Sequence, residues 1–229
     1  LMILATCTIS TFATQRGAHN IAIKGVREND ESTEHQDEHI LIPVSNEESV
    51  RELVTLGNVL KSKKNHNGFY ALHAIDNKVE DSGLEKRARK ILETAAAASD
   101  IYLHELLRYD VNISNAIASV AKEQSITDIV MGLHRDKSPA IFLGKITGDL
   151  LGESNVTTYI YKPVQPLATI KRHIVIIPSQ AEKEAGFLMW LHKIGNLARN
   201  TGTKIVVYAP ETTLKYIEPL RRKQTATVE

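Results

Sequence analysis

The sequence predicts an α/β fold: a parallel, five-stranded, doubly wound sheet followed by a partial second copy of the same unit. Short apolar runs alternate with stretches of helical spacing, which is typical of parallel strands covered on both faces by helices. The pattern of the first strand and helix returns later in the chain, which indicates an internal repeat. The length of 229 residues corresponds to about one and a half domains.

Five strands are expected in the first unit, with helices between them. Ser45 and Glu48 have the spacing of a capping box at the start of the first helix. Asn112 is expected to cap the third helix. The predicted strands are 39–44, 69–75, 101–106, 127–132 and 157–163, and helical spacing marks 50–60, 84–95, 113–121 and 146–151.

The second copy follows two prolines, and we expect the first unit to span 39–166 and the second 171–229. The run HIVIIP at 173–178 matches HILIPV at 39–44, and a later helix and strand match their counterparts in the first unit. The repeat stops after its second strand, which would leave a sheet edge open. We expect a homodimer to cover such a surface, through either the fifth strand or the half-repeat.

The beginning of the chain is an apolar stretch followed by a polar one. Residues 1–14 carry no charge, and positive charges come directly after them. Three interpretations stay open: a buried helix, a residual leader, or the end of a transmembrane helix at 1–16, too short here for the ~20 residues of a full span. In the third case the trailing positive charges place the rest of the chain in the cytoplasm. The acidic stretch within 17–38 is expected to be a solvated linker.

Composition excludes several functions. The 28 Lys and Arg residues nearly balance 27 Asp and Glu, so no basic field is present for gripping nucleic acid. The single cysteine, Cys7, makes neither an internal disulfide nor a zinc site. No P-loop, metalloprotease or nucleophile-elbow motif is found, and His73 is expected to be a core histidine. We therefore predict no metal site, no nucleic-acid partner and no enzymatic activity.

The ligand site of such a sheet lies beyond the carboxyl ends of the strands, where the strand order reverses. This rule places 44–45, 74–76 and 132–135 on one rim of the predicted sheet.

The stretch RYDVNISNAIASVAKEQSITDIVMGLHR at 108–135 resembles a universal stress protein domain. The resemblance covers roughly 40–163 as a whole domain and 173–210 as half of another. GLHR at 132–135, followed by FLGKITGDLL at 142–151, is similar to tandem stress-protein domains in the cytosolic tails of monovalent cation/proton antiporters. The resemblance implies a Rossmann-like regulatory domain on the cytoplasmic side of the inner membrane, with the transport domain of the same polypeptide as its partner.

ATP-binding members of that family carry G-x-x-G, nine residues, and then Gly followed by Ser or Thr. Gly132 matches the first glycine, whereas Arg135 stands at the second. Gly144 comes one residue early, Lys145 replaces the hydroxyl residue, and Ser45 takes the place of an aspartate after the first strand. In that motif glycines let backbone amides approach phosphate at a helix N-terminus.

Two alternatives are open for the basic side chains near this motif. They contact an anionic ligand directly, with the Thr147 hydroxyl from the first turn of the following helix, or they form salt bridges within a loop. The candidate ligand-binding residues are Val44, Ser45, Gly132, His134, Arg135, Gly144, Lys145 and Thr147. The resemblance admits ATP, AMP or a cyclic dinucleotide as ligand. The rival interpretations are a soluble universal stress protein that binds ATP or AMP, and a weak nucleotide hydrolase or nucleotidyl-transferring enzyme.

Overall fold

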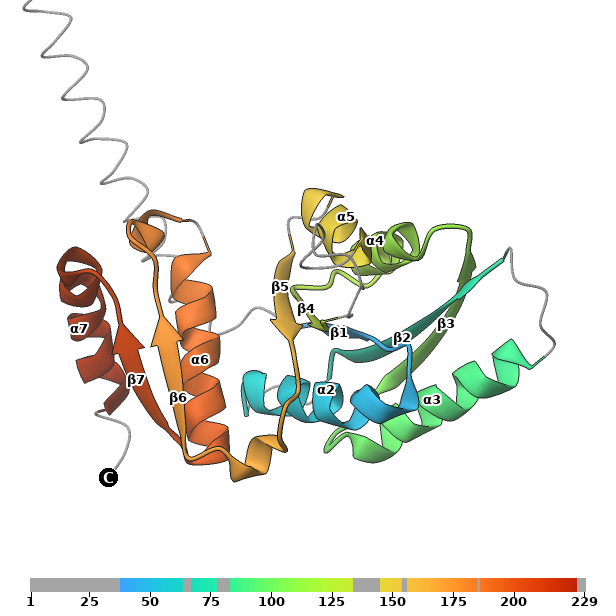
Figure 1. Cartoon of the computed structure of the whole chain (residues 1–229), viewed down its shortest axis with the longest axis horizontal. Coiled ribbons are helices and arrows are strands. Elements are labelled where there is room, and N and C mark those ends of the chain that lie inside the picture. The colour runs from blue at the N-terminus through green and yellow to red at the C-terminus, as the bar shows by residue number, and fades with distance from the viewer. Residues whose placement is uncertain are drawn as a thin grey trace, which may run out of the picture. The chain divides into compact units, whose positions relative to one another are not determined.

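The computed structural model describes residues 38–63, 67–77, 83–133, 145–153, 156–184 and 186–225. Five parallel strands form the first sheet, in the order β3-β2-β1-β4-β5 (Figure 1). They are β1 (Ile40–Pro43), β2 (Phe69–Asp76), β3 (His104–Asp110), β4 (Asp128–Gly132) and β5 (Thr157–Tyr161). The predicted α/β class and the doubly wound parallel sheet are confirmed.

Helices cover both faces of this sheet, as Figure 1 shows. The helices are α2 (Glu47–Leu60) and α3 (Leu84–Ala98) on one face, and α4 (Ile113–Glu123) and α5 (Lys145–Glu153) on the other. Successive strand residues point to opposite faces, so Ile40 and Ile42 join the core under α2 and α3 whereas Leu41 joins the core under α4. This division explains why the strand runs are apolar without alternation.

Helix α2 approaches the sheet closely because Gly57 lies on its inner face. A Cβ atom at this position would stand 2.7 Å from the ring of Phe69, which is itself buried in the core. The glycine therefore sets the distance at which α2 packs over β1 and β2.

Helix α2 is capped one residue later than expected. The Asn46 side-chain oxygen accepts hydrogen bonds from the backbone N of Ser49 at 2.8 Å and from its hydroxyl at 2.6 Å. The capping box predicted for Ser45 and Glu48 is therefore wrong, because Asn caps as well as Ser and here fills the position itself. The predicted cap of α4 is confirmed, since Asn112 accepts from the backbone N of its second following residue at 3.0 Å.

Strand β3 begins three residues later than the apolar run 101–106 predicted. A turn precedes it, in which the Ser99 hydroxyl donates to the carbonyl of Ile101 at 2.8 Å. Leu103 fills the core from this lead-in segment. The strand itself pairs with β2 from His104 to Asp110, and its polar residues are tolerated because it is an edge strand.

A second, two-stranded parallel sheet comes after the first, so a partial second sheet is present as expected. It consists of β6 (Arg172–Ile176) and β7 (Lys204–Tyr208), joined by α6 (Phe187–Thr201). Short 3-10 turns occupy Leu167–Thr169 and Ala181–Lys183. Helix α7 (Glu211–Thr225) was not predicted, although its Tyr216 and Ile217 pack onto the core of this sheet. The exact limits of the two domains stay a prediction.

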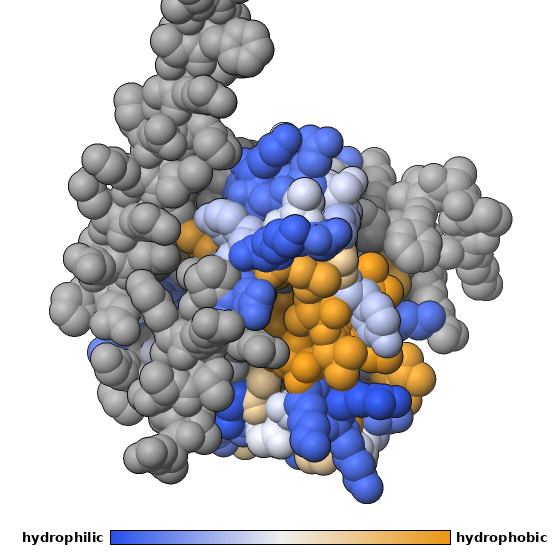
Figure 2. Space-filling view, turned by 90° about the vertical axis from the view of Figure 1, so that its left-hand side faces the viewer, coloured by the Kyte–Doolittle hydropathy of each residue, from blue (hydrophilic) through white to orange (hydrophobic). Residues whose placement is uncertain are grey.

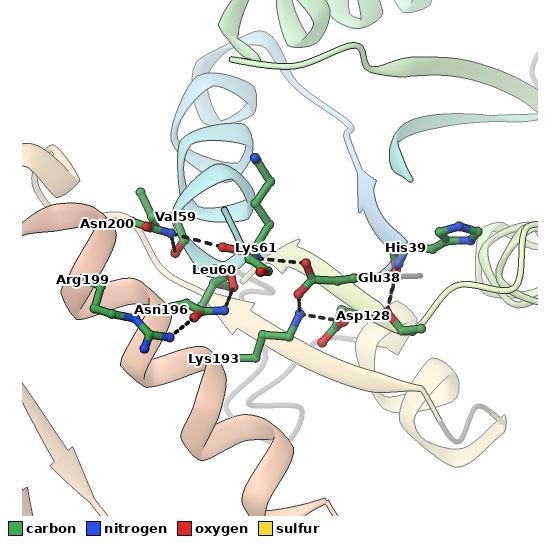
Figure 3. A network of polar contacts seen from close by, with 12 residues as sticks. Glu38, His39, Val59, Leu60, Lys61, Asp128, Lys193, Asn196, Arg199 and Asn200 are labelled. Atoms are coloured by element: carbon green, nitrogen blue, oxygen red, sulfur yellow. Dashed lines mark hydrogen bonds and ion pairs between the residues drawn. The ribbon is translucent and has the colours of Figure 1, made fainter. Parts of the chain in front are cut away.

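Helix α6 is joined to the first sheet by a buried lysine (Figure 3). The Lys193 ammonium forms an ion pair with Glu38 and a second with Asp128 at 3.0 Å, and its side chain is only 8% exposed. Glu38 lies two residues before β1, and Asp128 is the first residue of β4. Glu38 also accepts a hydrogen bond from the backbone N of Ser62 at 2.9 Å. Lys193 thus binds the amino ends of the two central strands.

Two asparagines of α6 hydrogen-bond to the last carbonyls of α2. The Asn196 side chain donates to the carbonyl of Leu60 at 3.1 Å, and Asn200 donates to the carbonyls of Val59 at 2.9 Å and Lys61 at 3.1 Å (Figure 3). The last carbonyls of a helix have no partner within that helix. The half-repeat therefore caps a helix of the first unit.

We expect Lys193→Met to lower the free energy of unfolding by about 3–5 kcal/mol, because it leaves two buried carboxylates without their cation. Urea denaturation at neutral pH measures this change. Lys215→Met is the matched control, since Lys215 pairs with Glu211 on an exposed helix surface. Its effect should stay within about 0.5 kcal/mol. Equal effects of the two substitutions would contradict this account.

Candidate functional site

The carboxyl ends of β1 and β4 lie side by side at the point where the strand order reverses. The two strands pair in parallel, with Ile40 opposite Asp128 and Leu41 opposite Ile129. The same register brings Val44 level with Gly132. The strand order reverses here, because the chain passes from β1 to β2 on one side and from β4 to β5 on the other. Such a switch point is where open α/β sheets bind ligands.

The fold does not require a glycine at position 132, the last residue of β4. A Cβ atom there would lie 3.6 Å from the nearest side-chain atom, of Leu53, which is an ordinary contact. Gly132 is also not among the glycines with positive φ. An alanine would therefore fit, and the bare backbone is available for the approach of a ligand.

The residues directly after β1 contribute backbone more than side chains. Val44 extends the pairing of β1, since its backbone N donates to the carbonyl of Leu72 at 2.8 Å, and its side chain is buried in the core. Ser45 is exposed on the rim. The structure thus brings Val44, Ser45 and Gly132 to one edge, as the sequence predicted.

The remaining candidate residues are only partly described. His134, Arg135 and Gly144 lie outside the described residues. Lys145 is the first residue of α5. Thr147 lies in the first turn of α5 and is 2% exposed, so its side chain is buried rather than open on the rim.

The two helices that begin at this rim differ in charge. The first turn of α2 contains Glu47 and Glu48, whereas the first turn of α5 contains no acidic residue. Because a helix N-terminus carries partial positive charge, the acids of α2 offset it and α5 retains it. An anionic group is therefore better accommodated beside α5 than beside α2.

A third carboxylate of α2, Glu52, strengthens this asymmetry. One of its oxygens is buried and accepts no hydrogen bond within the part of the chain that the structure describes. Burial, and to a smaller extent the charge of Glu52, raises the pKa of Tyr161 at the end of β5. Glu52 therefore lies near the end of β5 on the α2 face of the sheet, which disfavours an anion on that face.

His73 is the rim residue that sequence reasoning missed. It was expected to be a core histidine, but it is half-buried on β2 beside Val44. Burial lowers its pKa, and a hydrogen bond with the Val44 backbone partly opposes this effect. Its Nδ1 is buried and has no hydrogen-bond partner among the described residues. His73 directly precedes the segment 74–76, which the sequence placed on the rim, and this position indicated that His73 could lie there.

Two further classes of site were sought in the described ranges. No group of three or more His, Cys, Asp and Glu residues is arranged there to hold a metal ion. No helix in these ranges is both long and apolar enough to cross a bilayer. Residues 1–16, where the end of a membrane helix was predicted, lie outside the described part of the chain.

Comparisons with known proteins place the fold. Neither protein-family models nor curated sequences give a match. A universal stress protein from Archaeoglobus fulgidus superposes with a TM-score of 0.55 at 14% identity, covering 83% of this chain and 74% of that chain. The fold is that of universal stress protein domains.

Two further solved structures match a smaller part of the chain. A universal stress protein from Archaeoglobus fulgidus in complex with dAMP has a TM-score of 0.45 at 16% identity, covering 54% of this chain and 96% of that one. A universal stress protein in complex with cAMP has a TM-score of 0.44 at 15% identity, covering 55% and 96%.

The lowered pKa of His73 predicts a pH dependence of stability. The unfolded chain binds a proton at His73 near its ordinary pKa of 6.5, whereas the folded chain binds it only at lower pH. Stability is therefore complete above that value and decreases as pH falls below it.

Urea unfolding at about pH 7.5 and about pH 5 measures this loss, which should be smaller in His73→Gln than in the wild type. His173→Gln reports separately on the second histidine whose pKa is lowered by burial. An unchanged pH dependence in His73→Gln would refute the assignment.

Proposed function

We propose that this chain is a regulatory module that binds an anionic, nucleotide-type ligand at the carboxyl rim of its first sheet. The observation that carries the proposal is the juxtaposition at the switch point of the bare β4 backbone at Gly132 with the end of β1. The N-terminus of α5, which comes after β4 in the chain and begins at Lys145, has no acid in its first turn. These are the features that suit phosphate recognition through backbone amides.

The distribution of charge sets the orientation of the proposed ligand. Its phosphate lies toward β4 and α5, away from the carboxylates of α2. Its uncharged part lies toward β1 and β2, where Ser45 and His73 supply polar groups. We expect Arg135, which lies outside the described residues, and Lys145 to contact the phosphate, because these basic residues stand where the family motif has a glycine and a hydroxyl residue. ATP, AMP and cyclic dinucleotides all fit this description.

We further propose that the module is the cytosolic tail of a monovalent cation/proton antiporter and has no catalytic activity of its own. The uncharged run at 1–14 with trailing positive charges, and the GLHR and FLGKITGDLL segments, support this proposal. The mechanism would be a population shift, in which a ligand that favours one arrangement of the tail biases the transport domain. This assignment places the module at the cytoplasmic side of the cell membrane.

Substitution of Gly132 tests the ligand site. Calorimetry with ATP, AMP and a cyclic dinucleotide should detect binding of at least one to the wild type. Gly132→Ala should weaken that binding by about tenfold or more, because the added methyl group, which points toward Leu53, crowds the end of β4 where the ligand approaches the backbone. The variant should keep wild-type stability within about 0.5 kcal/mol, since the methyl group has room.

Gly152→Ala is the matched control, because a Cβ atom at Gly152, near the end of α5, meets nothing within 4 Å. This variant should bind like the wild type. Absence of binding with all three ligands, or equal affinity of the Gly132 variant, would contradict the proposed site.

The antiporter proposal is tested by the parent gene. Its reading frame upstream of Leu1 should encode several apolar spans of about 20 residues each, and the full protein should fractionate with membranes. A reading frame without such spans would exclude the antiporter and favour a soluble stress protein that binds ATP or AMP.

A further inference from the structure

The half-repeat, which runs from β6 to α7, has a hydrophobic core of its own. The buried residues of this core, and the apolar residues packed against them, all come from β6, β7, α6, α7 and the segments between these elements. Leu197 is the residue of α6 that joins the core of the first sheet instead. The half-repeat is connected to the first unit by the segment between Tyr161 and Arg172. It is therefore built as a separate folded unit on a short connection.

The face of α6 that meets the first unit is mostly polar. Lys193, Asn196 and Asn200 are spaced by three and four residues, so they lie on one face of the helix together with Leu197. Their partners are the carboxylates at the amino edge of the first sheet and the last carbonyls of α2 (Figure 3). A polar interface of this kind is typical of domains that move relative to one another.

The apolar surface of the half-repeat lies away from this interface. Ile176 and Tyr208 are 79% and 60% exposed on the face of the β6–β7 sheet that points away from α6. Figure 2 views the side of the molecule on which these strands lie and shows an apolar area bordered by hydrophilic residues. The interface of α6 with α2 is thus more polar than a face of the same unit that is already exposed. Separation of α6 from α2 therefore exposes little additional apolar surface.

The ions at this interface also lower the cost of separation. In the docked state the Lys193 ammonium and the carboxylates of Glu38 and Asp128 are largely removed from water. Removal from water is costly for each ion, and the attraction between the ions is spent in offsetting that cost. All three groups regain water when α6 separates from the first unit. The docked and separated states are therefore close enough in free energy for the separated state to reach about 0.1–10% of the population.

We propose that the half-repeat docks and undocks as a folded unit, with the Lys193 ion pairs as its latch and the segment between Tyr161 and Arg172 as its hinge. Glu38 directly precedes the residues that lead into β1, so a displacement of the chain before it acts on the ion pair with Lys193. The latch is independent of the proposed ligand site. It gives the chain two arrangements whose populations a ligand or a partner can shift.

Energy transfer between two dyes tests the proposal in the full 229-residue chain. The dyes are attached at Glu93→Cys on α3 and Thr212→Cys on α7, both exposed positions, in a Cys7→Ser background that removes the single native cysteine. Lys193→Met should increase the low-transfer, undocked population by about tenfold or more, because it leaves two carboxylates unpaired and buried in the docked state only. Lys183→Met is the matched control, since this lysine is exposed on the half-repeat and should leave the transfer unchanged.

Trp190 distinguishes undocking from unfolding, because it is the one tryptophan of the chain. Its ring lies against Phe187 in the core of the half-repeat, with the ring centroids 5.0 Å apart. Its emission wavelength should stay unchanged in Lys193→Met. Addition of Glu38→Gln and Asp128→Asn to this variant should restore the docked population, because no unpaired charge then remains. Unchanged energy transfer in Lys193→Met, a red shift of the Trp190 emission that accompanies its loss, or a failure of the added substitutions to restore docking would overturn the proposal.

Discussion

The ion pairs of Lys193 are the interaction on which the arrangement of this structure depends. A buried ammonium requires carboxylate partners, and Glu38 and Asp128 place those partners at the amino ends of β1 and β4. Burial, with a further contribution from both carboxylates, raises the pKa of nearby Tyr159, so its hydroxyl stays neutral. The lysine therefore fixes where α6 contacts the first unit. Leu197 of the same helix then packs against the core of the first sheet.

The same two strands serve different purposes at their two ends. At the amino edge, β1 and β4 are held by a charged network, together with the asparagines that cap α2. At the carboxyl edge, they end at Val44 and Gly132, where backbone rather than side chains is presented. Because ion pairs hold the amino edge, the carboxyl edge is left to carry chemistry. By linkage, a ligand that altered the spacing of these strands would also alter the docking of α6.

Local patterns were enough to predict the fold class, four of the five strands of the first sheet and the cap at Asn112. Edge strand β3 was misplaced because the apolar run before it fills the core from a turn at Ser99, which periodicity does not distinguish from a strand. The position of His73 at the rim depends on pairing register, and the partners of Lys193 lie 155 and 65 residues away in sequence. Such long-range contacts have no local signal. Val175 aligns with Leu41 in the sequence repeat, yet Val175 packs with α6 and α7 whereas Leu41 packs under α4, and alternating valines and isoleucines do not reveal this difference of one residue.

The central claim is that the carboxyl rim of the first sheet, at the β1–β4 switch point, receives the phosphate of an anionic ligand. Titration of the isotope-labelled chain with AMP, followed by backbone amide NMR shifts, tests it most directly. We predict shifts at 44–46, at Gly132 and in the first turn of α5, with little change at Lys193 or in β6 and β7. An absence of shifts at saturating AMP, or shifts centred on the amino edge of the sheet, would contradict the account.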